Sequence, residues 1–169
     1  MTGRTHAAAG ALVGALAGRL AGEPVAGMVV GALAALLPDV DHPGSLVGRR
    51  VRPVSALLET LAGHRTITHT VWFCLAGSVL AALGAAFARL ARPLWWTVGA
   101  CALLGLLSHL FLDALTRTGV EPFVPLKALP PWLDRLRHPR GPVVTGDPVV
   151  EVPVFIALTW AALRVAGVY

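Results

Sequence analysis

The sequence is too apolar and too poor in charge for an ordinary soluble domain. It has 169 residues, of which 56% are hydrophobic and 14% are charged, and its mean hydropathy is +0.70. Soluble domains carry about 25% charged residues, and disordered chains are far less apolar than this one. The apolar residues form long uncharged runs, which indicates a single membrane-embedded domain over residues 1–169.

The basic charge of the chain fits contact with membrane lipids better than nucleic-acid binding. Fourteen Lys and Arg residues against nine Asp and Glu residues give a net charge of +5. In a membrane protein such an excess reflects topology and attraction to anionic lipids. The sequence has no RNP-like, zinc-finger or helix-turn-helix pattern. We therefore expect membrane lipids as partners and no specific nucleic-acid binding.

Five apolar runs predict an all-α fold, a polytopic membrane helical bundle of four to five spans. The runs cover residues 7–18, 24–38, 70–88, 93–112 and 152–169. The third and fourth runs can cross about 30 Å of hydrocarbon at about 1.5 Å per residue, and the other three are shorter than ideal. A signal peptide is the alternative reading of the first run. Polar segments follow the second and fourth runs, and the longer one, 113–151, is expected to lie along the membrane surface.

Small residues in these runs predict close helix packing. Gly10, Gly14 and Gly18 repeat every four residues, a row that lets a second helix approach closely in lipid. The first two runs are expected to form a tight helical hairpin. Cys74 and Cys101 both lie in apolar runs, which predicts packed free thiols and no disulfide framework.

The distribution of basic residues predicts the orientation. Five spans would place the N-terminus and residues 39–68 and 113–151 on one side. That side would carry Arg4, Arg49, Arg50, Arg52, Arg65, Arg117, Lys127, Arg135, Arg137 and Arg140. The opposite side would carry Arg19, Arg89, Arg92 and Arg164. By the positive-inside rule the first side faces the cytoplasm.

Imidazoles and carboxylates gather at the span ends that share this predicted cytoplasmic side. We take them as metal ligands: His6, Asp39, His64, His69, His109 and Asp113. His109 and Asp113 are four residues apart, so a helix projects both from one face. Asp39 and Asp41 aim the same way if the chain there is extended, and one of them could bridge two ions. Mixed His and Asp ligands suit zinc, manganese or iron better than calcium or magnesium.

Each of these residues also has a structural interpretation. A histidine at a helix end can be a cap or an interfacial residue, and His109 with Asp113 can be a simple buried ion pair. Asp39 and Asp41 can cap a turn. Glu151 can be a ligand, a base, or a helix-start carboxylate favoured by the helix dipole. Ionisable residues at membrane depth are costly and usually functional, which favours a site.

At these residues the sequence resembles the YdjM-like family. The matching elements are Thr5-His6, Leu37-Pro-Asp-Val-Asp-His42, His64-Arg-Thr-Ile-Thr-His69 and Ser108-His-Leu-Phe-Leu-Asp113. They follow in the same order over almost the whole chain. Members are described as bacterial inner-membrane metal-dependent hydrolases. The resemblance therefore implies an inner-membrane location and a hydrolase whose substrate is poorly defined.

The order of the ligands is also similar, more distantly, to the zinc-dependent phospholipase C and single-strand nuclease group. Those enzymes are helical and cleave phosphodiesters with clustered zinc ions. This chain lacks the N-terminal Trp that binds zinc in that group, and it has no clear later HxxxE element. The similarity therefore implies one or two ions here, not three.

Together these observations predict a metal-dependent hydrolase with its site at the cytoplasmic end of the bundle. One or two divalent ions, with zinc favoured and manganese or iron as alternatives, would lower the pKa of a bound water toward about 7. Asp41 or Glu151 would act as general base. Arg65, with Arg49 and Arg50, would hold a phosphate through forked hydrogen bonds. The expected substrate is a phosphoester such as a lipid headgroup.

Two other classes of function fit the same residues. A transporter for metal ions or protons also carries His and Asp within its helices, but it needs polar residues through the whole bilayer. A metal-stabilised scaffold without turnover would have a closed site of four protein ligands.

Overall fold

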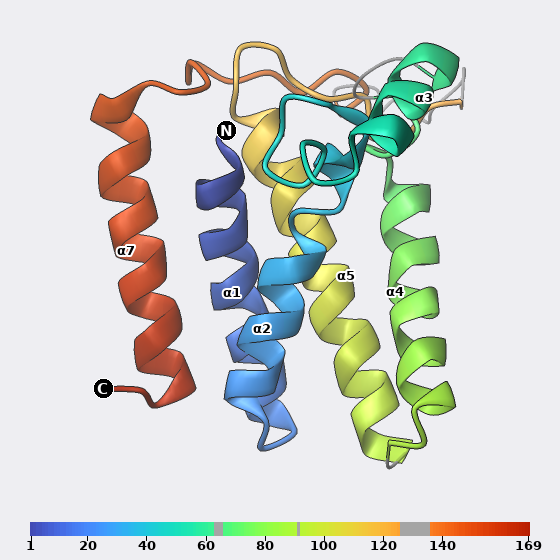
Figure 1. Ribbon diagram of the computed structural model, residues 1–169. Coiled ribbons are helices and arrows are strands. Elements are labelled where there is room, and N and C mark those ends of the chain that lie inside the picture. The colour runs from blue at the N-terminus through green and yellow to red at the C-terminus, as the bar shows by residue number, and fades with distance from the viewer. Residues whose placement is uncertain (63–65, 91, 126–135) are drawn as a thin grey trace.

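The computed structural model describes residues 1–62, 66–90, 92–125 and 136–169, and the elements of this part are helical (Figure 1). In chain order they are α1 (Gly3–Leu20), α2 (Pro24–Ala34), the short 3-10 helix η1 (Pro38–Asp41), α3 (Arg52–Ala62), α4 (Val71–Phe87), α5 (Arg92–Ala114) and α7 (Pro148–Ala166). Each of the five apolar runs contains one helix, so the predicted all-α class is confirmed.

Three helical stretches in the described residues are long and apolar enough to cross a membrane. They are Pro24–Asp41, Leu94–Ala114 and Pro148–Ala166. Helix α4 is equally apolar in character but has 17 residues. Helix α1 carries Arg4 and Arg19 near its ends and His6 in its first turns, which lowers its hydropathy. The count of four to five spans therefore stays a prediction, whereas three candidate spans are present.

Helix α1 lies at the centre of the bundle, where it packs against α2, α5 and α7. Its glycine row faces α2, as predicted. A Cβ atom on Gly14 would overlap the carbonyl oxygen of Gly27, and one on Gly10 would overlap that of Gly31. Gly27 and Gly31 of α2 pack against this row, so the backbones of the two helices are in direct contact. This contact fixes the hairpin that carries His6 and Asp39.

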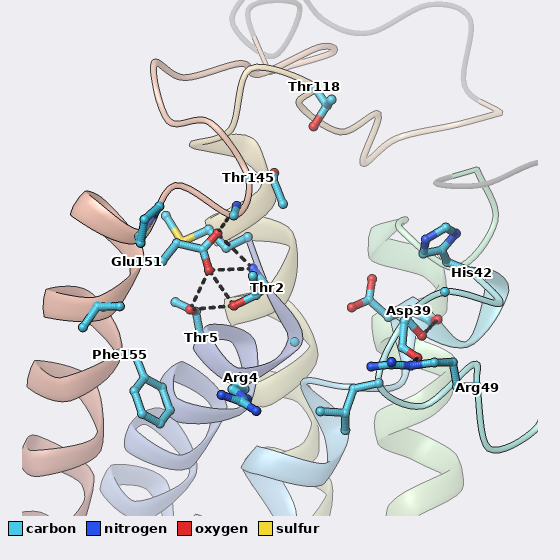
Figure 2. A pocket seen from close by; sticks show the side chains of 18 residues that line it. Thr2, Arg4, Thr5, Asp39, His42, Arg49, Thr118, Thr145, Glu151 and Phe155 are labelled. Carbon is cyan, nitrogen blue, oxygen red and sulfur yellow. Dashed lines mark hydrogen bonds between the residues drawn. The ribbon is translucent and has the colours of Figure 1, made fainter.

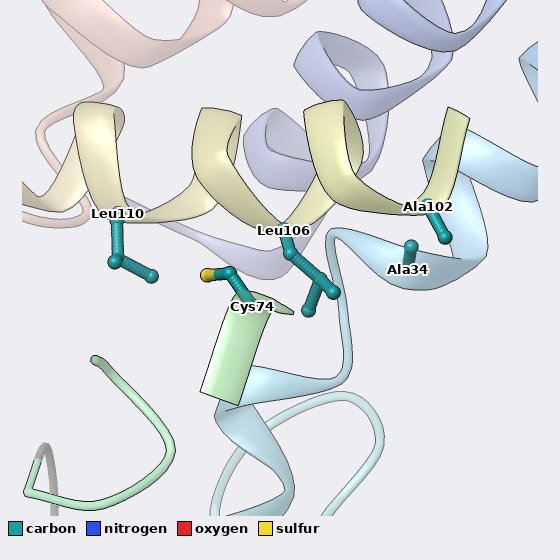
Figure 3. Close-up of a cluster of buried hydrophobic side chains, with 5 residues drawn as sticks. All are labelled: Ala34, Cys74, Ala102, Leu106 and Leu110. Carbon is teal, nitrogen blue, oxygen red and sulfur yellow. The ribbon is translucent and has the colours of Figure 1, made fainter. Parts of the chain in front are cut away.

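A small apolar core joins α5 to α2 and α4 (Figure 3). Its fully or nearly buried members are Ala34, Cys74, Ala102, Leu106 and Leu110. The sulfur of Cys74 packs among these side chains, and Cys101 is buried against α1. Both cysteines are free, so the predicted packed thiols are confirmed. The core packs α5 against α2 and α4, with the C-terminal turns of α5 at the end where the candidate ligands lie.

One end of the bundle carries the N-terminus, η1, α3, the end of α5 and the start of α7, and the C-terminus lies at the other (Figure 1). The prediction that these segments share one end of the bundle is therefore confirmed. Helix α3 lies within the segment 39–68, for which the sequence analysis expected only a polar connection. Val54 and Leu57 are three residues apart, with Glu59 and Thr60 following them, and this helical spacing of apolar and polar residues is the signal for the helix.

Candidate metal centre

Five of the six predicted ligands form one cluster at this end of the bundle. They are His6 of α1, Asp39 of η1, His69 just before α4, and His109 and Asp113 of α5. The two overlapping groups that could hold an ion are His6–Asp39–His109 and His69–His109–Asp113, each with its ligand atoms within 4.8 Å of one another. All but Asp39 are completely buried. The sixth predicted ligand, His64, lies outside the described residues.

The spacing within the cluster matches what a small cation requires. The Nε2 atoms of His69 and His109 are 3.2 Å apart, and each lies 3.7 Å from Asp113 Oδ2. Asp39 Oδ1 lies 3.7 Å from His109 Nε2 and 3.9 Å from His69 Nε2. Ligand atoms around a tetrahedral zinc are roughly 3.3–3.6 Å from one another. Two imidazole nitrogens and two carboxylate oxygens are thus nearly at the distances of one coordination shell.

The hydrogen bonds behind His109 determine which of its nitrogens carries the proton. His109 Nδ1 lies 2.7 Å from the carbonyl oxygen of Ala35 at the end of α2. A carbonyl oxygen only accepts hydrogen bonds, so Nδ1 is the protonated nitrogen of the neutral ring. The lone pair of Nε2 then faces the cluster, as in a metal-ligating histidine held by a backbone carbonyl.

The same reasoning applies to His69. The Thr68 hydroxyl donates to Asp41 Oδ2, so its oxygen accepts from His69 Nδ1 at 3.0 Å. His69 Nε2 is therefore also unprotonated in the neutral ring. Two lone pairs face each other across 3.2 Å with carboxylate oxygens beside them. The N-terminal ammonium of Met1 pairs with Asp113 Oδ1, on the other oxygen of that carboxylate. The two Nε2 lone pairs still repel each other, and a cation bound between them would remove this repulsion.

His6 adds a third imidazole to the cluster. Its ring stacks on that of His109 with centroids 3.7 Å apart and planes 17° apart. His6 Nε2 donates to the carbonyl oxygen of Met1 at 3.0 Å and lies 3.1 Å from Asp113 Oδ1. This leaves Nδ1 as the acceptor nitrogen, and it is buried without a hydrogen-bond partner among the described residues. An orphaned buried acceptor of this kind fits a second ligand position.

The two aspartates after Pro38 do not aim the same way. Only an extended segment would aim both carboxylates the same way, and residues 38–41 instead form a 3-10 helix, which turns nearby side chains in different directions. Asp39 Oδ1 faces the Nε2 side of His69, and Asp41 Oδ2 lies 3.7 Å from the Nδ1 side. Asp41 thus lies behind His69 and fixes its orientation together with Thr68.

A cleft of about 920 Å³ opens beside the cluster (Figure 2). Asp39 belongs to both, and its side chain is 16% exposed. Arg4 and Arg49 line the cleft together with apolar side chains such as Phe155. Arg50, which the sequence analysis also assigned to phosphate, is outside the lining and donates to the carbonyl oxygen of Leu46. The third predicted arginine, Arg65, lies outside the described residues.

The comparison with known proteins gives the family. The family described as "YdjM inner membrane protein" matches residues 1–168. The chain belongs to this YdjM family.

Three curated relatives are similar to the chain, and none of their names states an activity. This YdjM-family chain is 32% identical over 126 residues to "Uncharacterized protein YvsG" of Bacillus subtilis, covering 74% of both chains. It is 36% identical over 108 residues to "Inner membrane protein YdjM" of Escherichia coli, covering 62% of this chain and 50% of that protein. The YdjM of Shigella flexneri matches to the same extent. The match thus spans half the length of the curated YdjM proteins. No solved structure matches the chain.

Glu151, a predicted base, has a different neighbourhood from the cluster. It accepts hydrogen bonds from the backbone N–H groups of Thr2 and Gly146 and from the hydroxyls of Thr2 and Thr5 (Figure 2). The side chain lies in the first turn of α7, whose N-cap Asp147 accepts from Val149 N. Glu151 therefore joins the start of α7 to the start of α1.

Three site residues were missed by the sequence analysis of this YdjM-family chain. Thr68 bridges Asp41 and His69, Thr2 binds Glu151, and Arg4 lines the cleft. Their sequence signals are weak, because a hydroxyl beside a histidine and an arginine two residues before one are both common. Only the packing of α1 against α7 and of η1 against residues 68–69 brings them into the site.

Proposed function

We propose that this YdjM-family membrane protein is a metal-dependent hydrolase that cleaves a phosphoester at the membrane surface. One observation carries the proposal. The Nε2 lone pairs of His69 and His109 and the carboxylates of Asp39 and Asp113 converge in a buried cluster, and this cluster meets a cleft at Asp39. The inner-membrane location rests on the family.

The residues fit a divalent ion. Either His69, His109 and Asp113 with Asp39, or His6, Asp39 and His109, would hold one ion. The two sets are alternatives, because they share the single Nε2 lone pair of His109. Zinc is favoured by the mixed imidazole and carboxylate donors, with manganese or iron as alternatives. When bound, such an ion supplies a water nucleophile at neutral pH and stabilises negative charge on the substrate oxygen.

The side chains around the cluster have separate roles in this proposal. Arg49 and Arg4 bind the phosphate oxygens of the substrate, because guanidinium groups make forked hydrogen bonds to phosphate. Asp39 is the cluster carboxylate that reaches the cleft and so lies next to the substrate. Asp41 and Thr68 hold the His69 ring in its tautomer and orientation. Asp41 is 2% exposed and lies behind His69, so we assign it to positioning and not to proton transfer.

The distribution of buried polar groups favours an enzyme over a transporter. Among the described residues, the buried polar and charged side chains lie at the cluster end of the bundle, apart from Ser78 in α4. An ion pathway needs such groups through the bilayer. A structural site keeps four protein ligands, whereas a catalytic site keeps one position open for water. Asp39, which is 16% exposed and faces the cleft, marks where that open position would lie.

The first test measures bound metal. Protein purified in mild detergent is analysed by mass spectrometry for zinc, manganese and iron per chain. We expect His109→Ala and Asp113→Ala to lose the bound metal. His138→Ala is the control, because His138 is half-exposed and pairs with Glu121 outside the cluster. Equal metal content in all of these proteins would refute the site.

The second test measures phosphoester turnover. Arg49→Gln should lower kcat/KM for phosphodiester and lipid phosphoester substrates by about tenfold, since it removes a charge-assisted hydrogen bond while metal stays bound. The neighbouring Arg50→Gln is the control, because Arg50 lies outside the cleft lining. Absence of turnover with every phosphoester, in protein that holds stoichiometric metal, would contradict the proposed function.

A further inference from the structure

Two further hollows continue from the cleft along α7, toward the C-terminal end of the bundle. The first, about 270 Å³, shares Gly3, Arg4, Leu46 and Phe155 with the cleft. The second, about 380 Å³, shares Phe155, Thr159 and Leu163 with the first. Phe155 borders all three. We call the two hollows together the α7 groove. It begins at the cleft and continues along α7, a helix long and apolar enough to cross a membrane.

The walls of the α7 groove are apolar. Helix α1 contributes the small side chains Ala7 and Ala11, α2 contributes Met28, and α7 contributes Phe155 and Leu163. Among the described residues that line the groove, none has an acidic side chain, and Arg4, at the junction with the cleft, is the charged side chain. The positive charge is therefore placed at one end of the groove. The rest of the lining is mainly apolar, with Thr159, Trp160 and Tyr169 as its residues that carry a polar side-chain atom.

Helix α7 stands apart from the rest of the bundle. Only 17% of Pro148–Ala166 is buried, against 50% of Leu94–Ala114 in α5. Its main neighbour is α1, with few contacts to α2 (Figure 1). The first hollow lies among residues of α1, α2 and α7, and it continues into the cleft through the lining residues that the two share.

We propose that the α7 groove binds one acyl chain of an anionic phospholipid, whose phosphate lies between Arg4 and Arg49 in the cleft. Charge complementarity selects this occupant, because a cationic head site continues into an uncharged apolar channel. A water-soluble phosphoester would leave the channel unfilled, and a neutral lipid would leave the two guanidinium groups without an anion. This inference rests on the proposed function for the identity of the substrate, but lipid binding itself does not require catalysis.

The proposal is tested by crosslinking. The protein is placed in nanodiscs of phosphatidylcholine that contain phosphatidylglycerol with a photoreactive diazirine in one acyl chain, and the labelled residues are mapped by mass spectrometry. We expect labels concentrated on α1 and α7 around Ala11, Phe155 and Leu163. Excess unlabelled phosphatidylglycerol should compete, and glycerol 3-phosphate should not. Labelling spread equally over the exposed face of α4 would overturn the proposal.

Filling the groove gives a second measurement. Ala11→Phe should lower the labelling of α7 by about fivefold or more, because the ring occupies the space of the acyl chain. Ala76→Phe is the matched control, since Ala76 is exposed on α4 and outside the groove. If Ala11→Phe fails to fold, Thr159→Phe fills the same groove from α7. Unchanged labelling in a folded filling variant would overturn the proposal.

Two variants separate this inference from the hydrolase. Arg4→Gln should lower phosphatidylglycerol labelling by about tenfold while bound metal stays constant. His109→Ala should abolish bound metal while labelling of the α7 groove persists. Labelling without any phosphoester turnover would leave the lipid site standing and remove the proposed function. Turnover of lipid phosphoesters without groove labelling would support the proposed function and overturn the lipid site in the α7 groove.

Discussion

The Nε2 atoms of His69 and His109 face each other at 3.2 Å, and each ring is turned by a hydrogen bond on its other nitrogen. For His109 the partner is the carbonyl of Ala35, and for His69 it is the Thr68 hydroxyl, which itself donates to Asp41. Both imidazoles thus present acceptor nitrogens to the same point between two carboxylates. The elements α2, η1 and α5 hold these side chains in place, so the ligands are already oriented in the folded protein before an ion binds.

We predict that Asp41→Asn weakens metal binding without abolishing it. The change removes the negative charge behind His69 and leaves the metal ligands in place, and such outer-shell changes typically cost about 10- to 100-fold in metal affinity. A titration against a competing chelator measures the dissociation constant. Asp39→Asn, which changes a ligand, should cost more. Asp147→Asn serves as the control, because Asn also caps helices well and Asp147 lies outside the cluster. Wild-type affinity in Asp41→Asn would contradict the positioning role.

We predict that Glu151→Gln lowers the free energy of unfolding and has little effect on the rate of turnover. The buried carboxylate accepts from Thr2, Thr5 and Gly146, and an amide would direct an NH₂ group at these donors. The loss should be about 1–3 kcal/mol. Thermal unfolding in detergent and hydrogen exchange across α7 measure it, and Glu121→Gln, at a half-exposed carboxylate, is the control. A general base would give the opposite pattern, with unchanged unfolding and abolished turnover.

The sequence was sufficient for the features that depend on local spacing. A helix puts residues four apart on one face, so His109 and Asp113 converge whatever surrounds them. The same periodicity predicts that Gly10, Gly14 and Gly18 form one close-packing face. The sharing of one bundle end by the candidate ligands follows from the number of apolar runs, because an antiparallel bundle alternates its ends.

Other features depend on contacts that no spacing encodes. Whether Asp39 and Asp41 aim together depends on the backbone after Pro38, which is a 3-10 helix and not extended. Two of the partners of Glu151, Thr2 and Thr5, are separated from it by 149 and 146 residues, and these contacts follow only from the docking of α7 on α1. The choice of Arg49 over Arg50 for the cleft depends on the direction of one loop. In each case tertiary packing determines the direction or the partner of the side chain, and the local sequence is compatible with more than one.

We predict that Gly14→Ala destabilises the protein, whereas the same change at Gly84 does not. A Cβ on Gly14 would overlap the carbonyl oxygen of Gly27, while one on Gly84 meets nothing within 4 Å. Forcing α1 and α2 apart should cost about 1–3 kcal/mol. Gly84→Ala should be neutral or stabilising by up to about 1 kcal/mol, because Ala is the better helix former. Thermal unfolding of both variants in the same detergent compares them. Equal effects would show that the contact between the glycine faces does not limit stability.

The last prediction concerns the side of the membrane on which the cluster lies. By the positive-inside rule, the excess of Lys and Arg beside the cluster end predicts that this end faces the cytoplasm. Ala56→Cys in α3 and Ala21→Cys in the turn between α1 and α2 put exposed thiols at opposite ends of the bundle. In intact spheroplasts an impermeant maleimide should label residue 21 and should not label residue 56. After permeabilisation both should react, whereas the native Cys74 and Cys101 are buried and give little background. Labelling of residue 56 alone in intact spheroplasts would put the cluster outside the cytoplasm. The proposed substrate would then have to be a lipid of the outer leaflet, because Asp39 and the cleft arginines lie at that same end.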